Sequence, residues 1–156
     1  HDVPDRWKQP APSYSAGADG SADIVLDYTI VGTSQTLEKK YLRLTSAPNP
    51  ATVRPEPVLR AAIELIRSRY ESYGEERGQE QYIYLWEQMK SVRQDLTVQR
   101  IRNDFTVSVY EMHARICLEF DDQTEFKACQ AQLSQLYEEG LGTAAARREF
   151  KAYNIL

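Results

Sequence analysis

The stretch that decides the fold runs from Tyr82 to Leu96 and reads Tyr-Ile-Tyr-Leu-Trp-Glu-Gln-Met-Lys-Ser-Val-Arg-Gln-Asp-Leu. Its large apolar side chains recur at spacings of three and four, at Tyr82, Leu85, Trp86, Met89, Val92 and Leu96. Because an α-helix turns once in about 3.6 residues, this spacing puts them on one helical face. The stretch therefore predicts an amphipathic helix that buries this face.

Similar apolar stripes lie on both sides of this stretch. They cover residues 58–73, 109–120, 126–137 and 146–156. Gly74 and Gly140 follow two of them and are natural helix stops. The pattern predicts an all-α fold of five or six helices, each of about 10–18 residues, packed as antiparallel pairs in a bundle or a stacked helical repeat. The last stripe reaches Leu156 without a stop signal, which favours the open array and a chain that continues.

The periodicity also predicts the core. We expect the following residues to be mostly buried: Ile63, Ile66, Leu85, Trp86, Met89, Val109, Ile116, Phe126, Leu133 and Leu136.

The first part of the chain has a different character. Residues 1–22 contain prolines and glycines that break any period, and we interpret them as a flexible arm ahead of one helical segment, 23–156. Residues 23–32 look extended, but a single short apolar run makes no sheet, so we expect them to lie along the helices. Thr33 or Ser34 is a candidate N-cap for a short helix through about Arg43, before a proline-rich loop.

Composition excludes several classes of protein. The 156 residues carry 19 basic and 23 acidic side chains, a formal charge of −4, which excludes a uniformly basic nucleic-acid-binding coat. No apolar run approaches the ~20 residues of a membrane span. The two cysteines, Cys117 and Cys129, are too few for a secreted disulfide framework, and a reducing compartment fits best.

The sequence offers little for catalysis. His113 and Cys117 share a helical face, and Cys129 lies on the next predicted helix, so these three could hold zinc if the helices pack. No Cys-x-x-Cys or His-x-x-x-His spacing completes such a set. We therefore expect a core histidine and two small buried side chains, with no metal, no disulfide and no cofactor. There is no phosphate-binding glycine loop and no Gly-x-Ser-x-Gly, so we expect no enzymatic activity.

Basic residues concentrate in two places. Lys90, Arg93, Arg100 and Arg102 crowd one helix–helix corner, and Lys39, Lys40 and Arg43 form an earlier group. These seven side chains are the candidate RNA-binding residues. The alternative is bracing, in which arginines bond helix-end carbonyls and pair with Asp95 or Asp104.

Three stretches together resemble the SAC/GANP family. They are Glu38-Lys-Lys-Tyr-Leu-Arg-Leu-Thr-Ser-Ala-Pro-Asn-Pro-Ala-Thr-Val-Arg-Pro55, residues 91–115, and Phe126-Lys-Ala-Cys-Gln-Ala-Gln-Leu-Ser-Gln-Leu-Tyr137. The wording Arg93-Gln-Asp-Leu-Thr-Val-Gln99 is most similar to the Thp-type fungal members and their leukocyte-receptor-cluster animal relatives. The resemblance covers about residues 31–156, and Arg100 stands where relatives usually have glycine.

The resemblance implies a nuclear, non-enzymatic scaffold that couples transcription to mRNA processing, splicing or export. Family members carry stacked helices of the PCI N-terminal type followed by a winged helix, before which this chain ends. They pair with a second PCI protein resembling a COP9-signalosome subunit and with a small acidic DSS-type subunit, the latter through the winged helix. An RNA-binding module that acts through the corner at residues 90–102 is the alternative.

Overall fold

The computed structural model describes residues 13–16, 22–25 and 29–154. Residues 56–153 contain five α-helices: α1 (Glu56–Ser72), α2 (Gln79–Val98), α3 (Asp104–Glu119), α4 (Gln123–Glu138) and α5 (Ala144–Tyr153). They coincide with the five apolar stripes read from the sequence. The predicted all-α fold is confirmed for this part of the chain.

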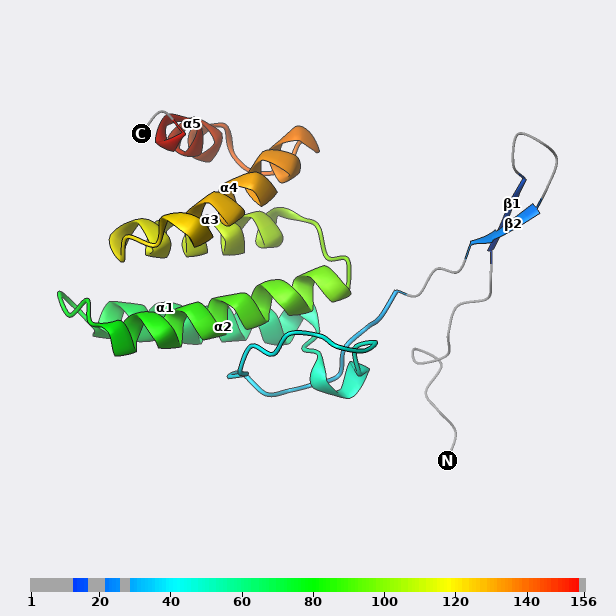
Figure 1. Ribbon diagram of the computed structural model, residues 1–156, viewed down its shortest axis with the longest axis horizontal. Coiled ribbons are helices and arrows are strands. Elements are labelled where there is room, and N and C mark those ends of the chain that lie inside the picture. The colour runs from blue at the N-terminus through cyan, green and yellow to red at the C-terminus, as the bar shows by residue number, and fades with distance from the viewer. Residues whose placement is uncertain (1–12, 17–21, 26–28, 155–156) are drawn as a thin grey trace.

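The helices stack in sequence order around two apolar clusters. One cluster joins α1 and α2 to one side of α3, through residues such as Ile66, Met89 and Val109. The other joins α4 and α5 to α3, through residues such as Tyr110 and Leu133. Figure 1 shows α1 beside α2, with α3 and α4 above them and α5 at the far end. Because α3 is covered from both sides, the packing is that of a helical-repeat array.

Local sequence explains where the helices begin and end. Asn103 caps α3 with Thr106 in a reciprocal capping box, and Thr143 caps α5 by accepting from the Ala146 amide. Gly74 and Gly140, both at positive φ, follow α1 and α4 as predicted.

The N-terminal part differs from the prediction. Ser13–Ala16 (β1) and Ala22–Val25 (β2) form an antiparallel hairpin. The extended conformation predicted from residue 23 is confirmed as far as Val25, but the expectation that this run makes no sheet is wrong. The flexible arm over 1–22 stays a prediction. A strand at residues 22–25 needs a partner strand, and the sequence pattern of Ser13–Ala16 did not identify it as one. The remaining residues of the predicted flexible arm, 1–12 and 17–21, lie outside the described residues.

The helix predicted from Thr33 through Arg43 is also wrong. Residues 29–49 run without regular secondary structure to a single 3₁₀ turn at Pro50–Thr52. The amides of Thr33 and Ser34 donate to Pro50 and Val53 carbonyls at 3.0 and 2.9 Å, which replaces helical hydrogen bonding. Gly32 lies so close to this turn that a Cβ there would sit 2.1 Å from the Val53 oxygen. Long-range pairing therefore outweighs the local capping signal.

Eight of the ten predicted core residues are buried, and Trp86 and Phe126 are only half-buried. Trp86 lies at the edge of α2, where Tyr41 meets it edge-on with ring centroids 6.2 Å apart. Phe126 packs in the same way against Tyr153, at 6.1 Å. Both were predicted to belong to the core because helical spacing gives a side chain's face and not the depth of cover over it.

Candidate functional site

The candidate site is the surface where residues 29–54 cross α2. The chain is held there by Arg54, a fully buried arginine that sequence reasoning did not single out. Its Nε donates to Asp95 at 2.8 Å, and its two terminal nitrogens donate to the Leu37 carbonyl at 2.7 Å and to Ser91 Oγ at 2.9 Å. Because a buried guanidinium needs all these acceptors, the segment has one favoured position on the helix.

Further bonds continue this attachment. Gln99 accepts from the Gly32 amide at 2.9 Å and donates to the Arg54 carbonyl at 2.6 Å. Gln88 accepts from the Lys39 amide at 3.2 Å, and Gln94 donates to the Leu42 carbonyl at 2.9 Å. A regular spacing of polar residues on the buried side of α2 was the one available sequence signal for this contact.

In the basic group Lys39, Lys40 and Arg43, only Lys39 makes an ion pair with a described residue. Lys39 Nζ donates to Asp95 at 2.8 Å and to the Thr52 carbonyl at 2.7 Å, so it belongs to the attachment. Lys40 and Arg43 are exposed and make no ion pair with any described residue. These two are therefore open to a partner.

The predicted basic corner is not one surface. Lys90 and Arg93 point toward α4, where Glu125 receives both, at 3.9 and 2.5 Å. Arg102 pairs with Glu139 at 2.5 Å and lowers the pKa of that carboxyl through the hydrogen bond. Most of this corner therefore braces helices, through Glu125 and Glu139 and not through the Asp95 or Asp104 that the bracing interpretation named.

Arg100 occupies an unusual backbone position. It is exposed, and its φ of 55° lies in the left-handed region, directly after α2. That conformation favours glycine.

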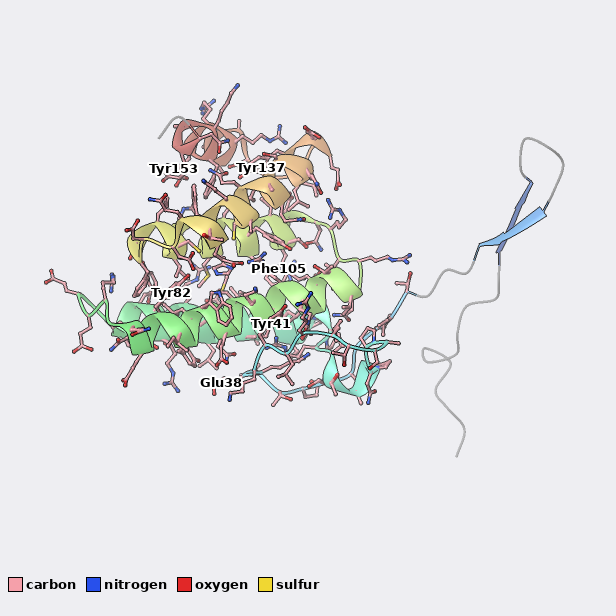
Figure 2. The ribbon with its side chains drawn as sticks, in the orientation of Figure 1. Glu38, Tyr41, Tyr82, Phe105, Tyr137 and Tyr153 are labelled. Atoms are coloured by element: carbon pink, nitrogen blue, oxygen red, sulfur yellow. The ribbon has the colours of Figure 1, made fainter. Side chains whose placement is uncertain are left out.

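Exposed apolar side chains lie on the outer face of the attached segment, residues 29–54. Leu42 is 71% exposed, and Leu37 and Leu44 are 39% and 46% exposed. Beneath them, Lys90 Nζ lies 4.7 Å from the Tyr41 ring centroid and 4.9 Å from that of Trp86. Figure 2 shows Glu38 and Tyr41 on this side of α2, away from the Tyr137 and Tyr153 end. A shallow hollow of about 320 Å³ beside Tyr41 and Leu44 completes the surface.

A second cluster lies between α3 and α4. Ligand atoms of His113, Glu125 and Cys129 lie within 4.8 Å of one another, and His113 and Cys129 are fully buried. Arg93 donates to His113 Nδ1 at 3.0 Å. An imidazole that bonds zinc through Nε2 carries its proton on Nδ1, where it would face this donor. The donor set therefore fits zinc poorly and fits the predicted structural role.

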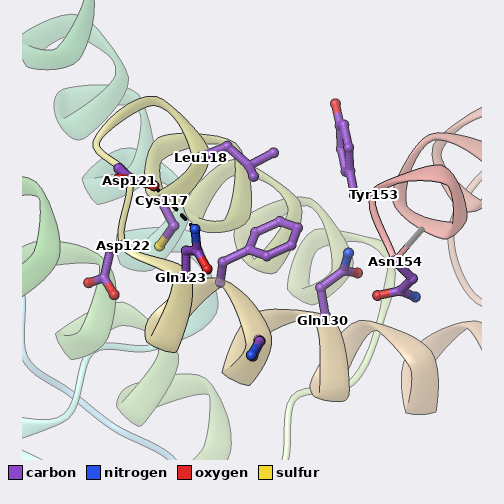
Figure 3. A pocket seen from close by; sticks show the side chains of 10 residues that line it. Cys117, Leu118, Asp121, Asp122, Gln123, Gln130, Tyr153 and Asn154 are labelled. Atoms are coloured by element: carbon purple, nitrogen blue, oxygen red, sulfur yellow. Dashed lines mark hydrogen bonds between the residues drawn. The ribbon is translucent and has the colours of Figure 1, made fainter. Parts of the chain in front are cut away.

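The thiols of this cluster are polarised in opposite senses. A hydrogen bond with Cys129, together with burial, raises the pKa of the Cys117 thiol. The same bond lowers the pKa of Cys129, helped by His113 and the charge of Arg93 against the cost of burial. Cys117 also borders a cavity of about 420 Å³, lined by Asp122, Phe126 and Tyr153 among others (Figure 3).

Within the described part of the chain, no helix is both long and apolar enough to cross a bilayer.

Comparison with known proteins agrees with the three sequence motifs. The sequence model of the SAC3/GANP family matches residues 31–156. The chain is 53% identical over 127 residues to the leukocyte receptor cluster member 8 homolog of Xenopus laevis, which is 81% of this chain and 15% of that protein. It is 51% identical over 127 residues to a THP3 homolog of Schizosaccharomyces pombe, 81% of this chain and 30% of that protein.

A plant relative extends the comparison. SAC3 family protein A of Arabidopsis thaliana is 48% identical over 128 residues, 82% of this chain and 12% of that protein. The chain thus spans less than a third of each of these three relatives.

Proposed function

Because the chain belongs to the SAC3/GANP family, we propose that it is a non-enzymatic scaffold segment of a nuclear PCI-type complex that couples transcription to mRNA processing, splicing or export. The stacked helices would form part of a PCI N-terminal repeat. The partners proposed are a second PCI protein resembling a COP9-signalosome subunit and a small acidic DSS-type subunit, the latter through a winged helix beyond Leu156. RNA would contact this segment only weakly.

The observation that carries the proposal is the surface of the attached segment. A buried ion pair and four further polar residues hold residues 29–54 in place, yet Leu37, Leu42 and Leu44 face outward. Exposed leucines on a firmly held backbone are typical of a protein-binding surface, because ordering costs little when the partner arrives. Lys40 and Arg43 beside them favour a partner with carboxylates around an apolar centre.

Paired substitutions test the scaffold role. Leu42→Glu with Leu44→Glu should abolish co-purification of the second PCI protein, while helical content and melting temperature stay unchanged. Leu118→Glu is the matched control, since Leu118 is 41% exposed on α3, away from this surface. If the double variant keeps its partner at the original affinity, this surface does not bind the PCI protein.

RNA binding is the second candidate, and the exposed Lys40 and Arg43, which make no ion pair with any described residue, favour it. Arg100→Glu with Arg102→Glu should weaken RNA binding by the assembled complex without releasing the PCI partner. The double variant must first be shown to fold, because Arg102 braces α4 through Glu139. If the RNA affinity at low salt is unchanged, Arg100 and Arg102 do not contact RNA, and the scaffold role is the one proposal that stands.

A further inference from the structure

An exposed serine lies in the outer loop of the attached segment. Ser46 belongs to a bend in this loop, which is held at both ends. On one side the Leu42 carbonyl accepts from Gln94 at 2.9 Å, and on the other Asn49 caps the 3₁₀ turn by accepting a backbone amide at 3.0 Å. Between these points, residues 43–48 make no hydrogen bond with any residue that the structure describes. Figure 1 shows this loop in cyan, outside the stack of helices, so its side chains can enter the groove of another protein.

The cations ahead of Ser46 form a recognition pattern. Arg43 stands three residues before Ser46, and Lys40 stands six residues before it. Both are exposed, and neither forms an ion pair within the described residues. Protein kinases that prefer basic substrates select the acceptor through such charges, which meet carboxylates in the kinase groove. The Arg43 guanidinium can make that contact without first breaking an ion pair to a described side chain.

The same Arg-x-x-Ser spacing occurs once more in the sequence, and the structure separates the two sites. Arg69 stands three residues before Ser72, which is the last residue of α1. The Ser72 hydroxyl donates to the Arg69 carbonyl at 2.6 Å, and the Arg69 guanidinium lies 3.9 Å from a Glu38 carboxylate oxygen. A kinase would have to unwind the end of α1 and open that ion pair. Of the two stretches, which are equal in spacing, the one at Ser46 is accessible.

We propose that Ser46 is a phosphorylation site for an ATP-dependent protein kinase of the basophilic class, and that its phosphate releases the partner from this surface. In the transfer, Ser46 Oγ attacks the γ-phosphorus of ATP and the bond from that phosphorus to the β–γ bridging oxygen breaks. ADP leaves, and the hydroxyl proton passes to the catalytic aspartate of the kinase. The products are phosphoserine and ADP, and nothing is oxidised or reduced.

A phosphate on Ser46 would reverse the charge of the docking surface. It carries about −1.5 to −2 charges near neutral pH, enough to offset the two cations Lys40 and Arg43. It would also lie two residues from Leu44, where a partner's apolar centre would have to desolvate it. This step rests on the proposed function, in which the partner brings carboxylates around an apolar centre. Phosphorylation should then repel the partner that the unmodified surface attracts.

Incubation of the folded chain with ATP, Mg²⁺ and calcium/calmodulin-dependent protein kinase II tests the site, because this kinase selects an arginine three residues before its acceptor. Mass spectrometry of the digest should show phosphate on Ser46 and none on Ser72. Synthetic peptides of residues 38–50 and 64–76 are the matched control, and both should be phosphorylated because neither is held in the fold. No phosphate on Ser46 in the folded chain, or an equal amount on Ser72, overturns the proposal.

Substitutions identify the acceptor and the cation that selects it. Ser46→Ala should remove the phosphate, whereas Thr45→Ala should keep it. Arg43→Gln should slow phosphorylation by roughly tenfold, through the loss of one charge-assisted contact with the kinase. Arg69→Gln is the matched control and should leave the rate at Ser46 unchanged. An unchanged rate in Arg43→Gln would show that the kinase does not read this cation.

Partner binding tests the release step. The fully phosphorylated chain and the untreated chain are compared for their affinity for the second PCI protein. Phosphorylation should weaken binding by at least about tenfold, and phosphatase treatment should restore it. Ser46→Ala treated with the kinase should bind like the untreated chain. Equal affinities of the two forms overturn the release step. If the untreated chain does not bind either, the proposed function fails with it, whereas the assignment of Ser46 as acceptor is decided by mass spectrometry alone.

Discussion

At the scale of single residues, buried charge explains the shape of the candidate surface. Asp95, which is 1% exposed, receives Arg54 on one oxygen and Lys39 on the other, both at 2.8 Å. Removing the Asp95 carboxylate leaves Arg54 buried without a counter-charge. The attachment of residues 29–54 therefore depends on one carboxylate.

Asp95→Asn should be strongly destabilising. The loss expected is about 3–5 kcal/mol of unfolding free energy, because Arg54 stays buried without its counter-charge. Urea denaturation of the parent and the variant measures it. Lys39→Met is the matched control and should cost below about 1 kcal/mol, since the Lys39 side chain is 23% exposed. Equal losses in the two variants would contradict this account.

Arg100→Gly should stabilise the chain. Arg100 sits at φ 55°, where an L side chain crowds its own backbone and glycine does not. The gain expected is about 0.5–1 kcal/mol, reduced by the extra freedom of glycine in the unfolded chain. A thermal melt compares parent, Arg100→Gly and Arg100→Ala, and the alanine variant should gain nothing.

At the scale of elements, α3 and the start of α4 carry the stacking. α3 buries residues on both sides, and the turn into α4 is held by Asp122, which accepts from the Glu125 amide at 3.0 Å and from the Tyr82 hydroxyl. Tyr82 belongs to α2, so this N-cap also joins α2 to α4. Asp122 is therefore both the N-cap of α4 and a tertiary contact between α4 and α2.

Asp122→Ala should show a pH-dependent loss of stability. Burial raises the pKa of Asp122, but the bonds from Tyr82 and the Glu125 amide outweigh it and lower the pKa overall. Its contribution is then present above the unfolded-state pKa of about 3.9 and is lost as the pH falls through the lower folded-state pKa. We expect the variant to lose about 1–2 kcal/mol at neutral pH.

Urea titrations at neutral and acidic pH measure this difference. The gap between parent and Asp122→Ala should narrow below a pH of about 3.9. Asp122→Asn keeps an acceptor for the Glu125 amide and should lie between the two at neutral pH. A gap of the same size at both pH values would mean that the carboxylate charge contributes nothing.

At the scale of the whole molecule, the distribution of cations separates the two functions considered. Four of the seven candidate RNA-binding residues are committed to carboxylates, namely Lys39, Lys90, Arg93 and Arg102. Of the seven, Lys40 and Arg43 are exposed and make no ion pair with any described residue. The exposed leucines of residues 29–54, Leu37, Leu42 and Leu44, lie on one continuous segment, whereas these two cations are the part of the basic groups left without an ion pair to a described residue.

RNA binding by this chain alone should therefore depend weakly on salt. Contacts from Lys40 and Arg43 imply a log–log slope no steeper than about −1.5 for single-stranded RNA, against roughly −3 if the four-residue corner engaged phosphate. Fluorescence anisotropy over a salt series measures the slope. A slope near −3 would show that the ion pairs to Glu125 and Glu139 open on binding.

Sequence alone was sufficient for the five helices, but not for the short helix predicted from Thr33 through Arg43. The five helices follow from apolar spacing, two of their ends from Gly74 and Gly140, and the family from three ordered motifs. These signals are short-range, because a helix bonds each amide to a carbonyl four residues away. The same reasoning placed His113 and Cys117 on one buried face.

Tertiary structure alone decided the path of residues 29–54 and the state of the basic corner. The Arg54–Asp95 bond spans 41 residues and the Arg102–Glu139 bond spans 37. The spacing of residues along the chain does not predict such pairings. A charged residue has the same place in the sequence whether its side chain contacts water or a buried carboxylate. The meeting of Cys129 with His113 and Glu125 likewise follows from how α3 packs on α4, because these residues lie on two different helices.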